Sequence, residues 1–383
     1  MPANPPSMIE MLRALVAIPS MSSVDARHDR GNQGVVEVLG AWLSDLGFSV
    51  AQQPLYGRPG KYNLIARLGR GSDGLVLAGH TDTVPYDEGA WRSDPFTLTE
   101  RDGRLYGLGV ADMKCFFPVV IEAIRHLDPT RLKKSLVIVA TADEESTMAG
   151  ARALLEAGER LGRFVLIGEP TSMQPVRLHK GVLMEALRIL GRSGHASDPR
   201  LGNSAIDGMH RVLGALIAWR AELTRDYRDP AFEIAVPTLN LGRIEGGDSP
   251  NRICAECEVQ IDLRILPGMQ VDTLRTTLIR RAEEALAGTG LGVERRALFD
   301  GVPPLCTDRA SPFVRLIEEI CGAPAGAVAF ATEGPFFNAL GMDSVVLGPG
   351  DIATAHQPDE HLPAERLAPM AALLRRIVLA VCR

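Results

Sequence analysis

The chain has 383 residues, of which 46% are hydrophobic and 23% charged, and it carries a net charge of −6. Acidic and basic residues are mixed along it without a basic tract or an aromatic-basic stripe, which argues against a nucleic-acid partner. No apolar run reaches the ~18 residues of a membrane span, and the length is typical of roughly two domains.

The N-terminal stretch, residues 1–20, has apolar positions at helical spacing, but Glu10 and Arg13 interrupt them. A secretory signal peptide needs an unbroken apolar segment at this place. The six cysteines are too sparse for a disulfide framework in a chain of this length. From these observations we expect a cytoplasmic protein.

Apolar runs typical of buried strands recur in the first and last parts of the chain. Helical patterns follow residues 115 and 148 and separate the first three runs. Strands that alternate with helices indicate an α/β fold, with a mixed, mostly parallel sheet and helices on both of its faces. The runs are residues 74–79, 135–141, 163–168 and 343–348.

The middle of the chain has a different pattern. Residues 179–293 show a strand, a long amphipathic helix, two strands and a second helix, with room for a last strand. This order is that of a ferredoxin-like α+β layer. Because it interrupts the α/β pattern, we expect a discontinuous first domain, residues 1–178 and 294–383, with the ferredoxin-like layer inserted as a second domain at 179–293.

One predicted strand runs directly into a group of acids. In LVIVATADEEST, residues 136–147, the apolar run is followed by Asp143, Glu144 and Glu145. Adjacent carboxylates repel one another and lose hydration at the end of a buried strand unless something compensates. A bound cation would do so, and a solvated turn is the alternative.

Other acids and histidines fall at equivalent places in the predicted sheet, whose functional sites are expected beyond the carboxyl ends of its strands. They are His80, Asp82, Glu169 and either His356 or His361 at strand ends, and Asp112 just before a helix. Mixed histidine and carboxylate ligands suit zinc, or a similar ion such as cobalt or manganese. Two such ions ~3.5–4 Å apart need a bridging carboxylate and can promote hydrolysis together.

Six motifs together resemble a known family. AGHTDTVP, GLGVADMK, TADEES, IGEPT, GRSGHAS and GPGDIATAHQPDEHL are similar to motifs of the di-zinc aminoacylase and carboxypeptidase superfamily, in the same order and over nearly the whole chain. The stretches ATEGPFFNALG, LGPGDIATAHQPDEHL and MIEMLRALVAIPSMSS are most similar to its acetylornithine deacetylase branch.

The resemblance implies two divalent metal ions, zinc first, with cobalt or manganese as alternatives. It assigns His80, Asp112 and Glu169 to one ion and Asp112, Glu145 and His356 to the other, with Asp112 bridging. Glu144 would be the general base, which takes a proton from the attacking water and passes it to the leaving amine. Asp82 would orient the ring of His80.

The resemblance also gives a role to the inserted domain, as a dimerisation and lid domain of a homodimer. His195 would reach the site of the other subunit and stabilise the developing oxyanion. Asn251 and Arg264 match positions that contact the substrate carboxylate, and Glu333 lies near the substrate region of the family. From the residues alone, a structural ion pair of Arg264 with Asp262 or Glu258 is the alternative to the substrate role.

The expected reaction is removal of acetyl from N-acetyl-L-ornithine, giving L-ornithine and acetate in arginine biosynthesis. A deacylase or dipeptidase acting on another small N-acyl amino acid is the alternative. A non-catalytic metal-binding homologue is the third hypothesis. Three positions depart from the family pattern, namely Cys115, Cys254 and the TEG of residues 332–334. None of them removes an expected ligand, but the last bears on the substrate.

Overall fold

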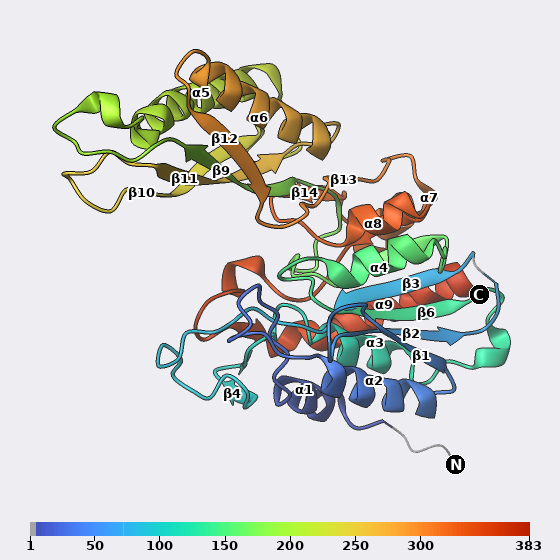
Figure 1. Cartoon of the computed structure of the whole chain (residues 1–383). Helices are drawn as coiled ribbons and strands as arrows, with labels where there is room; N and C mark the ends of the chain where they lie inside the picture. The colour runs from blue at the N-terminus through green and yellow to red at the C-terminus, as the bar shows by residue number, and fades with distance from the viewer. Residues whose placement is uncertain (1–4, 72) are drawn as a thin grey trace. The chain divides into compact units, whose positions relative to one another are not determined.

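The structure is a computed structural model that describes residues 5–71 and 73–383, so the first four residues of the N-terminal stretch lie outside the description. The chain forms two compact units (Figure 1). The first unit comprises Met1–Arg177, Thr307–Gly326 and Thr332–Arg383, and the second comprises Leu178–Cys306 and Ala327–Ala331.

The first unit is built on a mixed sheet in the order β1-β2-β6-β3-β7-β15. Its four parallel strands are β6 (Leu136–Thr141), β3 (Leu75–His80), β7 (Phe164–Ile167) and β15 (Asp343–Val346). They correspond to the four predicted apolar runs, and β3 and β6 are buried at every position. The predicted mostly parallel sheet is therefore confirmed.

Antiparallel strands extend this sheet at both edges. β1 (Ser49–Pro54) pairs with β2 (Tyr62–Leu68), which pairs with β6. At the other edge, β8 (Val176–His179) begins opposite Val346 of β15. The sequence did not predict β1, because this edge strand is largely exposed and has no apolar alternation.

Seven α-helices accompany the described part of this sheet, with α4 and α8 on one face and α2 and α3 on the opposite face (Figure 1). α3 and α9 pack against β3 and against each other, and α8 packs against β15. Each fully buried leucine or phenylalanine of this core stabilises the fold by about 1.5–3 kcal/mol. The helices are α1 (Met8–Val16), α2 (Gln33–Asp45), α3 (Phe116–Ile124), α4 (Ala149–Ala157), α7 (Pro312–Cys321), α8 (Gly334–Ala339) and α9 (Leu367–Cys382).

A small antiparallel sheet ties two distant segments of the first unit together. β5 (Arg104–Tyr106) lies between β4 (Thr99–Arg101) and β16 (His361–Pro363). The segment that follows β15 is thereby held beside the loop that leads into α3. Among the helices of the described residues, none is both long and apolar enough to cross a bilayer.

The second unit contains a separate four-stranded antiparallel sheet, in the order β10-β11-β9-β12. Its elements follow one another as β9 (Gly181–Leu190), α5 (Ala205–Asp226), β10 (Thr238–Gly246), β11 (Glu256–Ile265), α6 (Val271–Leu286) and β12 (Gly292–Ala297). This is the ferredoxin-like arrangement expected from the sequence. Along β11, buried and partly exposed residues alternate, because one face of the sheet packs on α5.

The second unit extends past the predicted limit of residue 293. β12 pairs with β9, and Val302 bridges Val182 further along. β13 (Leu305–Cys306) then pairs with the end of β8, and β14 (Gly326–Val328) also pairs with β8. The boundary differs from the prediction because these long-range pairings cannot be read from local patterns.

Gly348 allows the end of β15 to approach the end of β7 closely. A Cβ atom on Gly348 would lie 2.1 Å from the carbonyl oxygen of Gly168 and 2.4 Å from that of Glu169. Both obstacles are backbone atoms, so they cannot move aside as a flexible side chain could. The contact brings Glu169 to the carboxyl edge of the sheet.

We expect Gly348→Ala to lower the free energy of unfolding by about 1–3 kcal/mol, as overpacking of a close-packed interior does. Gly326→Ala is the matched control, because a Cβ atom there meets nothing within 4 Å. Thermal and urea unfolding of both variants measure the effect. Equal stability of the two variants would contradict the close approach.

Candidate metal centre

Parallel strands deliver acidic and histidine side chains to one edge of the first unit. His80 is the last residue of β3, Glu144 and Glu145 follow β6, and Glu169 follows β7. Asp112 lies in the loop before α3. The side chains meet because the carboxyl ends of neighbouring parallel strands lie at the same edge. His80, Asp112, Glu144 and Glu169 are all buried.

The carboxylate of Asp112 lies between two histidines. Its Oδ1 atom is 3.1 Å from Nε2 of His80, and its Oδ2 atom is 3.3 Å from Nε2 of His356. Glu169 Oε1 lies 3.7 Å from Nε2 of His80, and Glu145 Oε1 lies 2.9 Å from Nε2 of His356. Each histidine therefore has one further carboxylate beside it, and Asp112 is shared.

The described residues contain two groups of possible metal ligands. Within each group, all ligand atoms lie within 4.8 Å of one another. The first is formed by His80, Asp112 and Glu145, and the second by His80, Glu144 and Glu169. The second group includes Glu144, which the family resemblance assigns as the general base. Its carboxylate is thus close enough to exchange a proton with a group held at the centre.

The histidine that contacts the acids is His356. His361, the alternative left open by the sequence, lies in β16, with its ring centroid 5.2 Å from that of Tyr106. Its Nδ1 atom is 3.0 Å from the carbonyl oxygen of Asp359.

The centre concentrates negative charge away from water. Burial raises the pKa values of Glu144, Glu145 and Glu169, and neighbouring carboxylates add to each shift. Hydrogen bonds to Asp112 and Glu145 raise the pKa of His356 to about 11. Burial alone would lower the pKa of His80, but Glu169 and Asp112 outweigh it and raise the pKa well above its ordinary value.

These properties fit a divalent cation. Burial alone would raise the pKa of Asp112. Hydrogen bonds from His356 and His80 nevertheless hold this pKa below its ordinary value, so the carboxyl group stays ionised. Oε1 of Glu169 is buried and has no hydrogen-bond partner among the described residues. Oxygen and imidazole donors around excess buried negative charge are the ligands of zinc and related ions.

Asp82 fixes the turn that carries Glu144 and Glu145. Its Oδ1 atom accepts from the backbone N–H of Glu144 at 3.2 Å, and its Oδ2 atom accepts from that of Glu145 at 3.1 Å. Nδ1 of His80 lies 3.0 Å from the backbone carbonyl oxygen of Asp82 and 3.7 Å from its carboxylate. The carbonyl therefore orients the His80 ring more closely than the carboxylate expected from the sequence.

The remaining candidates divide between the units. Glu333 precedes α8 in the first unit, where burial raises its pKa to about 7, and neither carboxylate oxygen has a hydrogen-bond partner in the described chain. His195, Asn251 and Arg264 belong to the second unit. His195 and Asn251 are exposed on neighbouring loops, and Arg264 makes a bidentate ion pair with Asp262.

Glu360 is a buried acid that the sequence analysis missed. Its Oε1 atom accepts from the backbone N–H groups of Ala111 at 2.7 Å and Asp112 at 3.1 Å, and its Oε2 atom accepts from that of Gly109 at 2.9 Å. It lies four residues after His356, so it connects the segments that carry two candidate ligands. No local pattern marks this contact, because its donors are backbone N–H groups, which every residue but proline carries.

Comparisons with known proteins agree on one family. The family model "Peptidase family M20/M25/M40" matches residues 76–380. The chain is 47% identical over 377 residues to an acetylornithine deacetylase from Pasteurella multocida (strain Pm70), covering 98% of each chain. It is 46% identical over 379 residues to one from Edwardsiella ictaluri (strain 93-146), covering 99% of this chain and 98% of the relative.

Solved structures share the fold at lower sequence identity. An M20 family metallo-carboxypeptidase from Sulfolobus solfataricus has a TM-score of 0.77 at 17% identity, covering 98% of this chain and 99% of that one. An aminopeptidase from Bacillus cereus ATCC 10987 has a TM-score of 0.74 at 22% identity, covering 98% of both chains. The likeness extends over both compact units.

Glu360→Gln should weaken divalent-metal binding by about 10- to 100-fold, as loss of a group that orients a ligand does. The amide nitrogen of glutamine cannot accept from a backbone N–H, so the Asp112 loop loses part of its support. Titration calorimetry with zinc measures the effect, and Glu365→Gln, at an exposed acid, is the control. Metal affinity equal to that of the unaltered protein would show that Glu360 does not position Asp112.

Proposed function

The chain belongs to peptidase family M20/M25/M40, and on that premise we propose that it is a metal-dependent amidohydrolase acting on N-acetyl-L-ornithine. The products are L-ornithine and acetate, a step of arginine biosynthesis. The observation that carries the reaction type is the carboxylate of Asp112 between His80 and His356, with Glu144 beside them. Relatives that are 46–47% identical over nearly the whole chain support the substrate.

The proposed cofactor is a pair of divalent ions, zinc in the first place, with cobalt or manganese as alternatives. His80, Asp112 and Glu169 would hold one ion, and Asp112, Glu145 and His356 the other. The two oxygens of Asp112 face different histidines, as a bridging carboxylate requires. When bound, such ions lower the pKa of water and polarise an amide carbonyl.

Glu144 is the proposed proton carrier. Burial raises its pKa well above the ordinary value, and a carboxylate whose pKa is raised binds a proton more readily. Glu144 takes a proton from the water whose oxygen attacks the acetyl carbon. It then gives that proton to the nitrogen as the C–N bond breaks, leaving acetate and the free amine. Asp82 holds the backbone of Glu144 during both transfers.

His195 is the proposed oxyanion donor. Its Nδ1 atom accepts from the backbone N–H of Ser197 at 3.2 Å, so in the neutral ring Nε2 carries the hydrogen. Donation from Nε2 would stabilise the negative charge that develops on the carbonyl oxygen. We propose that His195 acts in the site of a second copy of the chain, which makes the second unit a dimerisation and lid domain and the enzyme a homodimer. The first unit then forms the catalytic domain.

Three further residues are proposed to recognise a small N-acyl amino acid in the cytoplasm. Asn251 and Arg264 would contact its carboxylate, for which a guanidinium is a bidentate donor. The ion pair with Asp262 already holds the Arg264 side chain in one orientation. Glu333 is proposed to lie at the substrate region. Glycine follows Glu333, where alanine is more frequent in the acetylornithine branch. For this reason another N-acyl amino acid is the second candidate substrate.

Metal-stripped protein should release no ornithine from N-acetyl-L-ornithine, and added zinc or cobalt should restore release. N-succinyl-diaminopimelate and N-acetylmethionine, assayed in parallel, should be poorer substrates by kcat/KM. Restored turnover that favours another substrate would keep the reaction type and replace the substrate. Protein that binds metal but hydrolyses none of the three would contradict the proposal.

Mixing two inactive variants tests whether His195 acts across subunits. His195→Ala and Glu144→Ala should each lose at least about 100-fold in kcat, as losses of an oxyanion donor and a general base do. Under conditions of proven subunit exchange, hybrid dimers regain one complete site, so activity should partly return. Each variant exchanged with itself is the control. An absence of recovery would mean that His195 works within its own subunit or has no catalytic role.

A further inference from the structure

Asp143 has no part in the proposed reaction, although it directly precedes Glu144. Its backbone is left-handed, with φ of 58°, a conformation that is uncommon for any residue but glycine and persists only when the surroundings hold it. Its side chain is 2% exposed. The turn that aims Glu144 and Glu145 therefore begins with a constrained residue whose buried carboxylate needs compensation.

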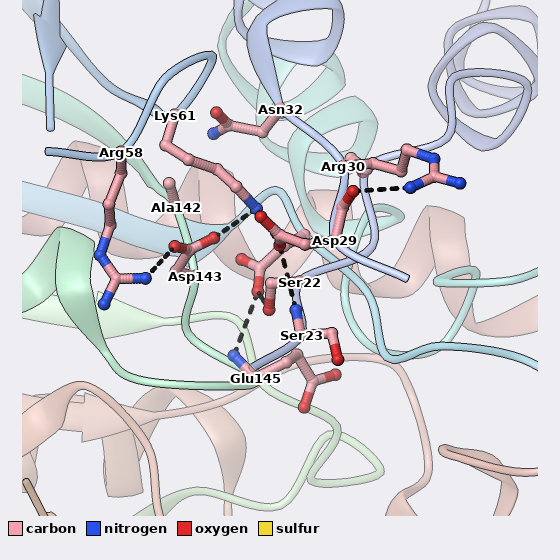
Figure 2. Close-up of polar contacts among 12 residues, drawn as sticks. Ser22, Ser23, Asp29, Arg30, Asn32, Arg58, Lys61, Ala142, Asp143 and Glu145 are labelled. Carbon is pink, nitrogen blue, oxygen red and sulfur yellow. Dashed lines mark hydrogen bonds and ion pairs between the residues drawn. The ribbon is translucent and has the colours of Figure 1, made fainter. Parts of the chain in front are cut away.

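Lys61 supplies that compensation from a distant part of the sequence. Its Nζ atom lies 2.7 Å from Oδ1 of Asp143 and 2.8 Å from Oδ1 of Asp29, and its side chain is also 2% exposed (Figure 2). Arg58 contributes a second cation, with Nη1 2.9 Å from Oδ2 of Asp143. Both oxygens of Asp143 thus face a positive charge.

The contacts of Lys61 close a ring with those of Asp82. Oδ1 of Asp29, which Lys61 holds, accepts from the backbone N–H of Ser23 at 3.1 Å. The neighbouring Ser22 donates from Oγ to Oδ2 of Asp82 at 2.6 Å. Asp82 in turn accepts from the backbone N–H groups of Glu144 and Glu145, and the ring returns to Asp143 through the chain.

The geometry points to Lys61 as a positioning residue for the catalytic centre. We propose that Lys61 holds Asp143 in its left-handed conformation and thereby directs the Glu144 and Glu145 side chains toward the metal ligands. Lys61 touches neither substrate nor metal and acts through Asp143. Without it, the buried Asp143 would lie near the partly exposed Asp29 with no buried cation between the two carboxylates, and like charges in such a place move apart. The turn would then move away from Asp82.

Arg58 should matter less than Lys61, although it pairs with the same carboxylate. Its side chain is 41% exposed and lines a cavity of about 490 Å³ together with Ser23, Tyr56, Lys61 and Thr147. Water in such an open place can replace an exposed cation, whereas nothing replaces a fully buried one. The pair of residues therefore provides an internal comparison.

The inference rests on the proposed substrate for its rate measurement and on the proposed metal ligands for its zinc measurement. Lys61→Met should lower kcat for N-acetyl-L-ornithine by at least 10-fold while KM changes less than threefold. It should also weaken the binding of one of the two zinc ions by at least 10-fold, because Glu145 is displaced. Lys61→Arg should recover part of both losses, and Arg58→Met should lose less than threefold. Lys133→Met, at an exposed lysine, is the control for loss of one cation.

A structural ion pair alone would lower thermal stability without changing the properties of the folded fraction. Assays therefore run well below the unfolding transition of each variant. If Lys61→Met does not fold, Asp143→Asn replaces it, since asparagine tolerates a left-handed backbone and removes only the charge. Folded protein of either variant with unchanged kcat and zinc affinity would overturn the proposal. Zinc calorimetry needs no substrate, so it decides the matter even if N-acetyl-L-ornithine is not hydrolysed.

Discussion

The mutual repulsion of carboxylates buried at one edge of a sheet is the constraint on which the rest of this structure depends. Asp112, Glu144, Glu145 and Glu169 converge there with only two imidazoles among them. Such a group loses hydration, and two imidazoles cannot neutralise four carboxylates. A rigid parallel sheet can impose this arrangement because its strands are fixed by burial on both faces. The unfavourable charge is then available to bind cations.

The surroundings hold the acidic side chains in place through the backbone. Asp82 accepts from the N–H groups of Glu144 and Glu145, and Glu360 accepts from three N–H groups around Asp112. Lys61 fixes the start of the turn through Asp143. Each support is itself a buried polar side chain, so the centre rests on a second layer of polar contacts. This arrangement keeps the candidate ligands oriented.

Sequence patterns predicted those features that depend on local order. Apolar runs located β3, β6, β7 and β15, and the alternation along β11 marked a half-buried strand. Acids and histidines at strand ends indicated the centre, because the carboxyl ends of parallel strands all lie at the same edge of the sheet. Family motifs then distinguished His356 from His361, which spacing alone did not.

Features that depend on contacts between distant segments escaped prediction. Lys61 and Asp143 are joined only when β2 pairs with β6, and Glu360 reaches the Asp112 loop only through the pairing of β16 with β5. The left-handed backbone of Asp143 has no signal in a sequence without glycine at that position. The end of the second unit was likewise set by the pairing of Val302 with Val182.

Diffraction at the zinc absorption edge, from crystals of the zinc-loaded protein, tests most directly whether Asp112 bridges two ions. We expect two anomalous peaks. One should contact His80, Asp112 and Glu169, and the other Asp112, Glu145 and His356, while Glu144 contacts neither ion. A single fully occupied peak, a peak bound by Glu144, or peaks at other residues would contradict this account of the centre.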